Sequence, residues 1–93
     1  MLVMVKSSPD STEGKRGVKL AMDMDADLIL IQNAVYFSQK KRLASFGGTA
    51  YALGEDMRLR GIRSDSTGSK IREIDYDKLV DLMMQEEKVF GAF

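Results

Sequence analysis

The stretch that decides the fold of this chain runs Leu28-Ile29-Leu30-Ile31-Gln32-Asn33-Ala34-Val35-Tyr36. Its first four residues are continuously apolar, which is typical of a central parallel strand that is covered on both faces. We therefore expect a buried strand over residues 26–31. A polar and aromatic corner follows it, and the apolar spacing beyond that corner predicts a helix over residues 33–43.

Two shorter elements precede this stretch. Leu2-Val3-Met4-Val5 is apolar and rich in residues that favour strands, so it predicts a buried first strand. The Pro and the small polar residues of 7–11 indicate a turn. Ser11 or Asp10 is then placed to cap a helix that runs through Met24.

Two more pairs of strand and helix follow the central stretch. The expected elements are a strand over 49–53, a short helix over 55–60, a polar loop over 62–69, a strand over 70–74 and a helix over 77–87. Gly61 is placed to end the short helix. The last helix is amphipathic, and its apolar side is expected to consist of Leu79, Val80, Leu82, Met83 and Met84.

The alternation of strands and helices predicts an α/β fold. We expect a single small domain over residues 1–93, with a mainly parallel sheet of four or five strands and helices on both faces. The apolar tail Val89-Phe90-Gly91-Ala92-Phe93 lies beyond the last helix. It either folds back onto the sheet or docks on another subunit, and both alternatives remain open at this point.

Composition excludes several classes of function. Fourteen basic and fourteen acidic residues cancel, so the chain lacks the basic footprint of a protein that binds nucleic acid by itself. The 93 residues contain no cysteine and no histidine, which removes disulfides, thiolate nucleophiles and the commonest general base. No apolar run approaches the roughly 20 residues that span a bilayer, and the apolar run 1–5 is too short for a signal peptide. We expect a soluble cytoplasmic protein.

Sequence patterns for a metal or a catalytic centre fail on inspection. Asp23, Asp25 and Asp27 alternate like the start of a calcium loop. Leu28 stands where that loop needs Gly, and Ala34 stands where it needs Glu. The serines have no histidine to activate them. We therefore expect no metal, no cofactor and no catalytic residue.

The carboxyl ends of parallel strands meet at one edge of a sheet, where ligands and partners of open α/β sheets bind. This rule brings together the interface or groove candidates Ser8, Gln32, Asn33, Tyr36, Glu55, Asp56 and Tyr76. Two further candidates, Phe90 and Phe93, come from the apolar tail. A purely structural alternative is that Asn33 and Asp77 cap helices and that the tyrosines fill the rim of the core.

Four segments, in the same order, resemble the DsrH/TusB family of the DsrE/DsrF/DsrH-like sulfur-relay proteins. They are the N-terminal strand with Lys6-Ser7-Ser8-Pro9, residues 27–36, residues 51–53 with 55–56 and 60–61, and residues 74–77 with 80–82 and 87–89. The resemblance covers most of the chain. It departs from the family at Asn33-Ala34, where an acidic residue and a glycine are usual, and at the C-terminal residues 90–93.

The resemblance implies a subunit that works with DsrE/TusD-like and DsrF/TusC-like partners. One branch of the family serves 2-thiouridine formation at the wobble uridine of tRNA, and another serves sulfur oxidation. Sulfur passes as a persulfide between cysteines, so this cysteine-free chain is predicted to be a non-catalytic subunit rather than a carrier. The alternatives are a homo-oligomeric ligand-binding or regulatory domain, and an enzyme that uses Lys6 or Asp56.

Overall fold

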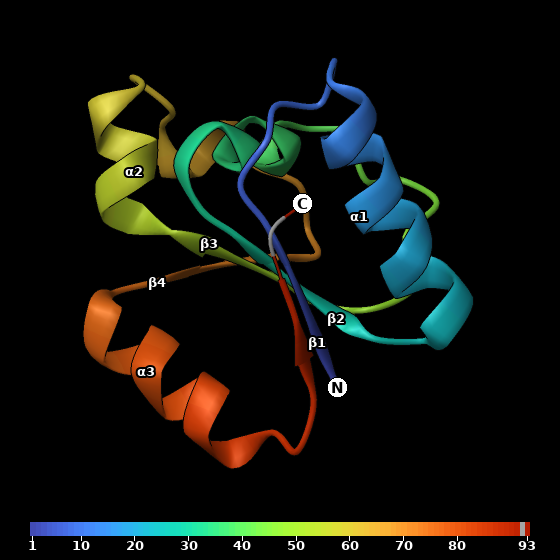
Figure 1. Cartoon of the computed structure of the whole chain (residues 1–93). Helices are drawn as coiled ribbons and strands as arrows, with labels where there is room; N and C mark the ends of the chain where they lie inside the picture. Colours follow the sequence, from blue (N-terminus) through green and yellow to red (C-terminus); the bar gives the residue numbers. More distant parts are fainter. Residues whose placement is uncertain (92) are drawn as a thin grey trace.

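Five parallel strands form one sheet in the order β4-β3-β2-β1-β5 in the computed structural model, which describes residues 1–91 and Phe93 (Figure 1). The strands are β1 (Leu2–Val5), β2 (Asp27–Leu30), β3 (Ala50–Leu53), β4 (Ile71–Ile74) and β5 (Val89–Phe90). The expected α/β class and the mainly parallel sheet are confirmed. The strand expected over residues 26–31 forms the centre of the sheet as β2.

The helices are α1 (Thr12–Met24), η1 (Gln32–Ser38), α2 (Gly54–Leu59), η2 (Ser64–Ser66) and α3 (Tyr76–Gln85). Ser11 caps α1, because its hydroxyl oxygen accepts a hydrogen bond from the Gly14 N–H at 3.0 Å. Asp75 caps α3 in the same way, through the Lys78 N–H at 2.8 Å. Asp77 therefore lies inside the helix, and its alternative role as the cap is wrong.

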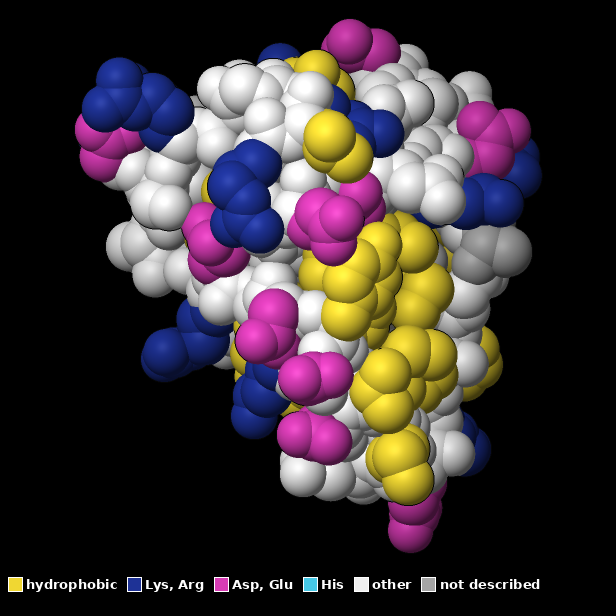
Figure 2. All heavy atoms as spheres, turned by 90° about the vertical axis from the view of Figure 1, so that its left-hand side faces the viewer, with side chains coloured by type: hydrophobic (Ala, Val, Ile, Leu, Met, Phe, Trp, Pro, Cys, Tyr) yellow, Lys and Arg dark blue, Asp and Glu magenta, His cyan; other side chains and the backbone are white. Residues whose placement is uncertain are grey.

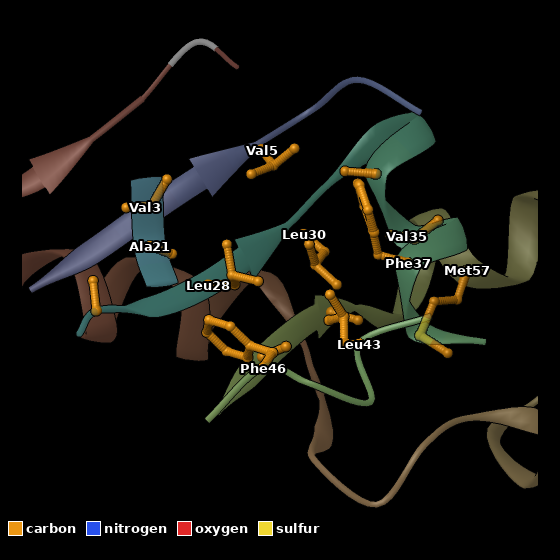
Figure 3. Packing of buried hydrophobic residues seen from close by; sticks show 14 of the residues in the cluster. Val3, Val5, Ala21, Leu28, Leu30, Val35, Phe37, Leu43, Phe46 and Met57 are labelled. Carbon is orange, nitrogen blue, oxygen red and sulfur yellow. The ribbon is translucent and has the colours of Figure 1, made fainter. Parts of the chain in front are cut away.

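The alternation of side chains along the strands divides the core into two layers. Val3 and Val5 of β1 belong to one cluster, which also contains Leu28 and Leu30 of β2. In Figure 3 these two leucines point toward Phe46 and Leu43 of the connection that follows η1. The intervening side chains point to the other face, where Leu2, Ile29, Leu53, Ile74, Leu79 and Leu82 form the second cluster.

The strand order explains why helices are unevenly distributed over the two faces. The connections β1–β2, β2–β3 and β3–β4 all cross the sheet in one direction, so right-handed crossovers place them on one face. Ala21 of α1, Val35 of η1 and Met57 of α2 accordingly pack into the first cluster. The return from β4 to β5 runs in the opposite direction, which places α3 on the other face (Figure 1).

The helix expected over residues 33–43 is wrong in kind and in length. The chain forms the 3₁₀-helix η1, which ends at Ser38. Its side chains include β-branched and aromatic residues that form α-helices poorly. The Ser38 hydroxyl also donates to the Val35 carbonyl oxygen at 2.6 Å, and Gln39 pairs with Thr67 in an isolated bridge. These contacts turn the chain away before an α-helix is established.

The polar loop expected over residues 62–69 is partly wrong. Residues 64–66 form the short 3₁₀-helix η2, and Ile62 at the start of the segment is buried in the first cluster. The Ile62 N–H donates to the Met57 carbonyl oxygen at 2.9 Å, just beyond Gly61, which has a φ of +68°. Gly61 thus turns the chain after α2, as expected, and directs the next side chain into the core.

Only part of the apolar side of α3 is buried against the sheet. Leu79 and Leu82 are buried, as predicted. Val80, Met83 and Met84 belong to the expected apolar side of the helix but are exposed. The physical reason is geometric, because a single straight helix can place only one stripe of side chains against a sheet.

The apolar tail folds back onto the sheet. Val89 and Phe90 form β5, which pairs with Leu2 and Val3 of β1. Phe90 and Phe93 pack against the first cluster, beside α1. A Cβ built on Gly17 of α1 would lie 2.8 Å from the Cβ of Phe93, so the helix approaches this ring closely. Ala92 lies outside the described residues.

Candidate functional site

Polar residues at the carboxyl edge of the sheet form one connected cluster. The Asp56 carboxylate at the start of α2 accepts a hydrogen bond from the Gln32 backbone N–H at 2.7 Å. The Arg60 Nε donates to the Asn33 side-chain oxygen at 3.0 Å. Arg60 also pairs with the Asp56 carboxylate at 3.9 Å and donates to the Asp56 carbonyl oxygen at 3.2 Å. We call Gln32, Asn33, Asp56 and Arg60 the carboxyl-edge cluster.

Local backbone geometry positions this cluster. Gln32 follows β2 and has a φ of +51°, a left-handed conformation that is unfavourable for a residue with a Cβ. The charge-assisted hydrogen bond from its N–H to Asp56 holds it there. The side chains of Gln32 and Asn33 remain exposed, so they are available to a partner.

Arg60 is the member of the cluster that the sequence did not identify as a site residue. It lies four residues after Asp56 on α2, and this spacing places oppositely charged side chains side by side on a helix. That spacing is the signal from which Arg60 could have been inferred. Its guanidinium links α2 to Asn33 of η1 and so fixes the corner that follows β2.

Two more of the expected residues meet at a neighbouring hollow of about 290 Å³. Glu55 of α2 and Tyr76 of α3 line it, together with Arg58 and Glu73. Arg58 and Glu73 form an ion pair at 3.6 Å. The hollow is therefore polar, and its lining includes the start of α3.

The remaining expected residues lie apart from this edge cluster or inside the core. The Ser8 carbonyl oxygen accepts hydrogen bonds from the N–H and the hydroxyl of Ser11, so Ser8 shapes the turn before α1. Tyr36 is half-buried and packs against the first core cluster, which agrees in part with the structural alternative. Phe90 and Phe93 pack beside α1.

The edge offers hydrogen-bonding groups and charge, and the two residues considered as bases differ in their surroundings. Asp56, the carboxylate considered as a base, is engaged by Gln32 and Arg60. Lys6, the alternative base, is exposed. Within residues 1–91 and Phe93, no group of three potential metal ligands comes together.

A second cavity, of about 270 Å³, lies on the face that carries η1. Its apolar lining comes from Phe37, Leu43, Ala44 and Ile71, and its polar lining from Gln39, Lys41, Gly68, Ser69 and Lys70. The Lys70 ammonium donates to the carbonyl oxygens of Ala44 and Phe46. Within the described part of the chain, every helix is too short or too polar to cross a membrane.

Comparisons with known proteins identify a matching family model and solved structures with a similar fold. The family model described as DsrH like protein matches residues 6–89. The ychN protein from E. coli has a similar structure, with a TM-score of 0.85 and 14% identity over 98% of this chain and 97% of that one. Protein Tm0979 from Thermotoga maritima gives a TM-score of 0.69 and 29% identity over 94% of each chain. Among curated proteins, no match is found.

Proposed function

This chain belongs to the DsrH-like family, and from that premise we propose that it is a non-catalytic subunit that supports persulfide transfer by a cysteine-bearing partner. A persulfide is a sulfur atom bound to a cysteine sulfur, and this sequence contains no cysteine. The chain therefore cannot carry the sulfur. Its contribution is to assemble with the carrier and to shape the surroundings of the carrier's reactive thiol.

The observation that carries this proposal is the carboxyl-edge cluster. Exposed Gln32 and Asn33 supply hydrogen-bonding groups. Asp56 holds the Gln32 backbone in place, and Arg60 holds the Asn33 side chain through its oxygen. Tyr36 follows on the same 3₁₀-helix and supplies rigid aromatic area. Interfaces with rigid aromatic anchors and preorganised polar groups bind without a large loss of conformational entropy.

The partners that we propose are DsrE/TusD-like and DsrF/TusC-like subunits. The balanced charge of fourteen basic and fourteen acidic residues argues against direct binding of tRNA, since tRNA binding needs an excess of basic side chains. The proposal covers both branches of the family, formation of 2-thiouridine in tRNA and sulfur oxidation. It places the chain in the cytoplasm, where thiols stay reduced and reactive.

Copurification tests this proposal. The tagged chain is expressed in its native cells, recovered, and analysed by mass spectrometry. We expect a DsrE-like protein with a reactive cysteine and a DsrF-like protein to copurify with it. Recovery of the chain alone as a homo-oligomer would contradict the proposed function and leave the fold unaffected.

Tyr36→Ala tests whether η1, which also carries Gln32 and Asn33, takes part in the assembly. If Tyr36 anchors a partner, the variant weakens assembly by more than about 1 kcal/mol. Tyr36→Phe, which keeps the ring, serves as the control and retains assembly. Unchanged assembly together with reduced stability of Tyr36→Ala would assign this residue to the core alone.

A second candidate function is the binding of a small anionic ligand in the cavity of about 270 Å³. Its apolar floor and its two lysines, Lys41 and Lys70, suit a compact molecule with one carboxylate or phosphate group. A panel of aromatic carboxylates and phosphate esters tests this by thermal shift. A ligand that raises the melting temperature of the wild type but not of Lys41→Ala supports this function.

A further inference from the structure

The outer side of α3 carries an apolar stripe of exposed side chains. Tyr76, Val80, Met83 and Met84 have exposed fractions of 53, 52, 38 and 80%. Their positions follow the pattern i, i+4, i+7 and i+8, which places them along one side of the helix. Leu79 and Leu82 form the neighbouring stripe that contacts the sheet. α3 thus has two apolar stripes, of which one contacts the sheet and the other is exposed.

The topology of the sheet enlarges this surface. A helix is about 10 Å wide, whereas five strands spaced by about 4.8 Å extend over roughly 19 Å. α3 is the helix that covers this face within the described residues, so it leaves part of the sheet accessible. Met4, Ile31 and Tyr51 point to the same face, pack at the edge of the second core cluster, and are only half-buried.

Figure 2 shows the side of the molecule toward which β3 and β4 run in Figure 1. Hydrophobic side chains form a continuous band from the middle of this side down over its lower part, and acidic side chains lie beside it. We call the exposed stripe of α3, together with Met4, Ile31 and Tyr51, the α3 face.

The charge around the α3 face is strongly asymmetric. Residues 73–87 contain six acidic side chains and one basic side chain, so the rest of the chain contains eight acidic and thirteen basic ones. A second copy that docked through the same face would bring two acidic borders together, which opposes association. The complementary occupant has an apolar surface bordered by lysine and arginine.

We propose that the α3 face binds an apolar surface with a lysine- and arginine-rich border on a different subunit, of the DsrE-like or DsrF-like kind. This inference rests on the proposed function and names a second surface, in addition to the carboxyl edge, through which the chain contacts its complex. Two exposed methionines suit such a contact, because their flexible side chains adapt to a partner's shape. The acidic border selects the partner and speeds its approach.

The test uses the whole chain and the purified DsrE-like and DsrF-like proteins of the same genome as probes. Met84→Glu places a charge at the C-terminal end of the stripe, at a side chain that is 80% exposed, so folding is retained. We expect binding to weaken at least tenfold. The matched control is Met22→Glu on α1, a methionine that is 46% exposed and lies on another helix; its binding should stay within twofold of the wild type.

The acidic border is tested separately by charge reversal. Asp81→Lys should weaken binding at low salt, and the difference from the wild type should shrink as the salt concentration rises, because ions screen exposed charges. Asp10→Lys, at an exposed position before α1, is the control and should have little effect. Circular dichroism melting curves confirm that each variant is folded.

The possible outcomes separate the two proposals. Binding by the wild type and by Met22→Glu, with loss in Met84→Glu, supports the α3 face. Equal binding by Met84→Glu and the wild type overturns the α3 face but leaves the proposed function intact. Failure of the wild type to bind either protein overturns the proposed function itself. A homo-oligomer that Met84→Glu dissociates overturns the assignment to a different subunit.

Discussion

The Asp56 carboxylate accepts a hydrogen bond from the backbone N–H of Gln32 at 2.7 Å. This contact joins the start of α2 to the left-handed residue that ends the central strand, 24 positions earlier in the chain. It fixes the corner on which Asn33 and the rest of η1 depend. The same contact therefore determines both local stability and the presentation of the carboxyl-edge cluster.

Asp56→Ala should lower the free energy of unfolding by about 1–3 kcal/mol, because it removes the charged acceptor of the Gln32 N–H hydrogen bond. Asp56→Asn keeps a carbonyl oxygen at that position, so it should lower the free energy of unfolding by less. Glu55→Ala, an exposed acidic neighbour on the same turn, is the control and should change stability by less than about 0.5 kcal/mol. Urea denaturation measures all three; equal losses in Asp56→Ala and Glu55→Ala would refute the structural role.

Lys41 has a φ of +72°, a conformation that costs a residue with a Cβ about 1 kcal/mol or more. Lys41→Gly should therefore relieve strain. Lys40→Gly removes the same charge at an adjacent exposed position that lacks a positive φ, so it is a matched control. We expect Lys41→Gly to be more stable than Lys40→Gly by about 1 kcal/mol in chemical denaturation. The reverse order would show that the turn has another conformation.

Gly17→Ala should destabilise the protein, although Ala favours helices. The added Cβ would lie 2.6 Å from Val5 Cγ2 and 2.8 Å from Phe93 Cβ, so the core must shift. A loss of about 1–3 kcal/mol is expected from such overpacking. In the Phe93→Gly background the additional loss of stability should be smaller, since glycine lacks the Cβ that makes one of the two clashes. Strictly additive losses in thermal unfolding would contradict the packing of Phe93 on α1.

Ser11→Ala should lower the free energy of unfolding by about 0.5–2 kcal/mol. The Ser11 hydroxyl both caps α1 and donates to the Ser8 carbonyl oxygen at 2.7 Å. Thr12→Ala, at the next and exposed position, should change stability little. Thermal unfolding by circular dichroism compares the two variants. A neutral Ser11→Ala would mean that the turn, rather than the cap, determines where the helix begins.

The sequence was sufficient for the order of strands and helices because their signals are local. The apolar run at residues 28–31 and the cap at Ser11 predict β2 and α1 without reference to the rest of the chain. The 3₁₀ form of η1 was not predictable in this way. It depends on the contacts of Ser38 and Gln39, the second of which pairs with a residue 28 positions away.

The candidate site shows the same limit. The rule that the carboxyl ends of parallel strands meet at one edge of a sheet predicted that Gln32, Asn33 and Asp56 lie close together. In the structure, hydrogen bonds connect Gln32 to Asp56 and Asn33 to the neighbouring Arg60. It could not predict that Arg60 joins them. The periodicity of the last helix likewise could not separate Leu82 from Met84, because which apolar stripe meets the sheet depends on the direction of the crossover.

The pairing of β5 with β1 has a consequence for the order of folding. It closes a loop of almost the whole chain through only two residue pairs, whereas β1 and β2 join through four pairs over about 25 residues. Closing the longer loop costs about 1 kcal/mol more in chain entropy. We expect β5 to attach last and to detach first in hydrogen exchange. While it is detached, β1 is an open strand edge, so the chain is most prone to pair with a strand of another molecule before residues 89–90 dock.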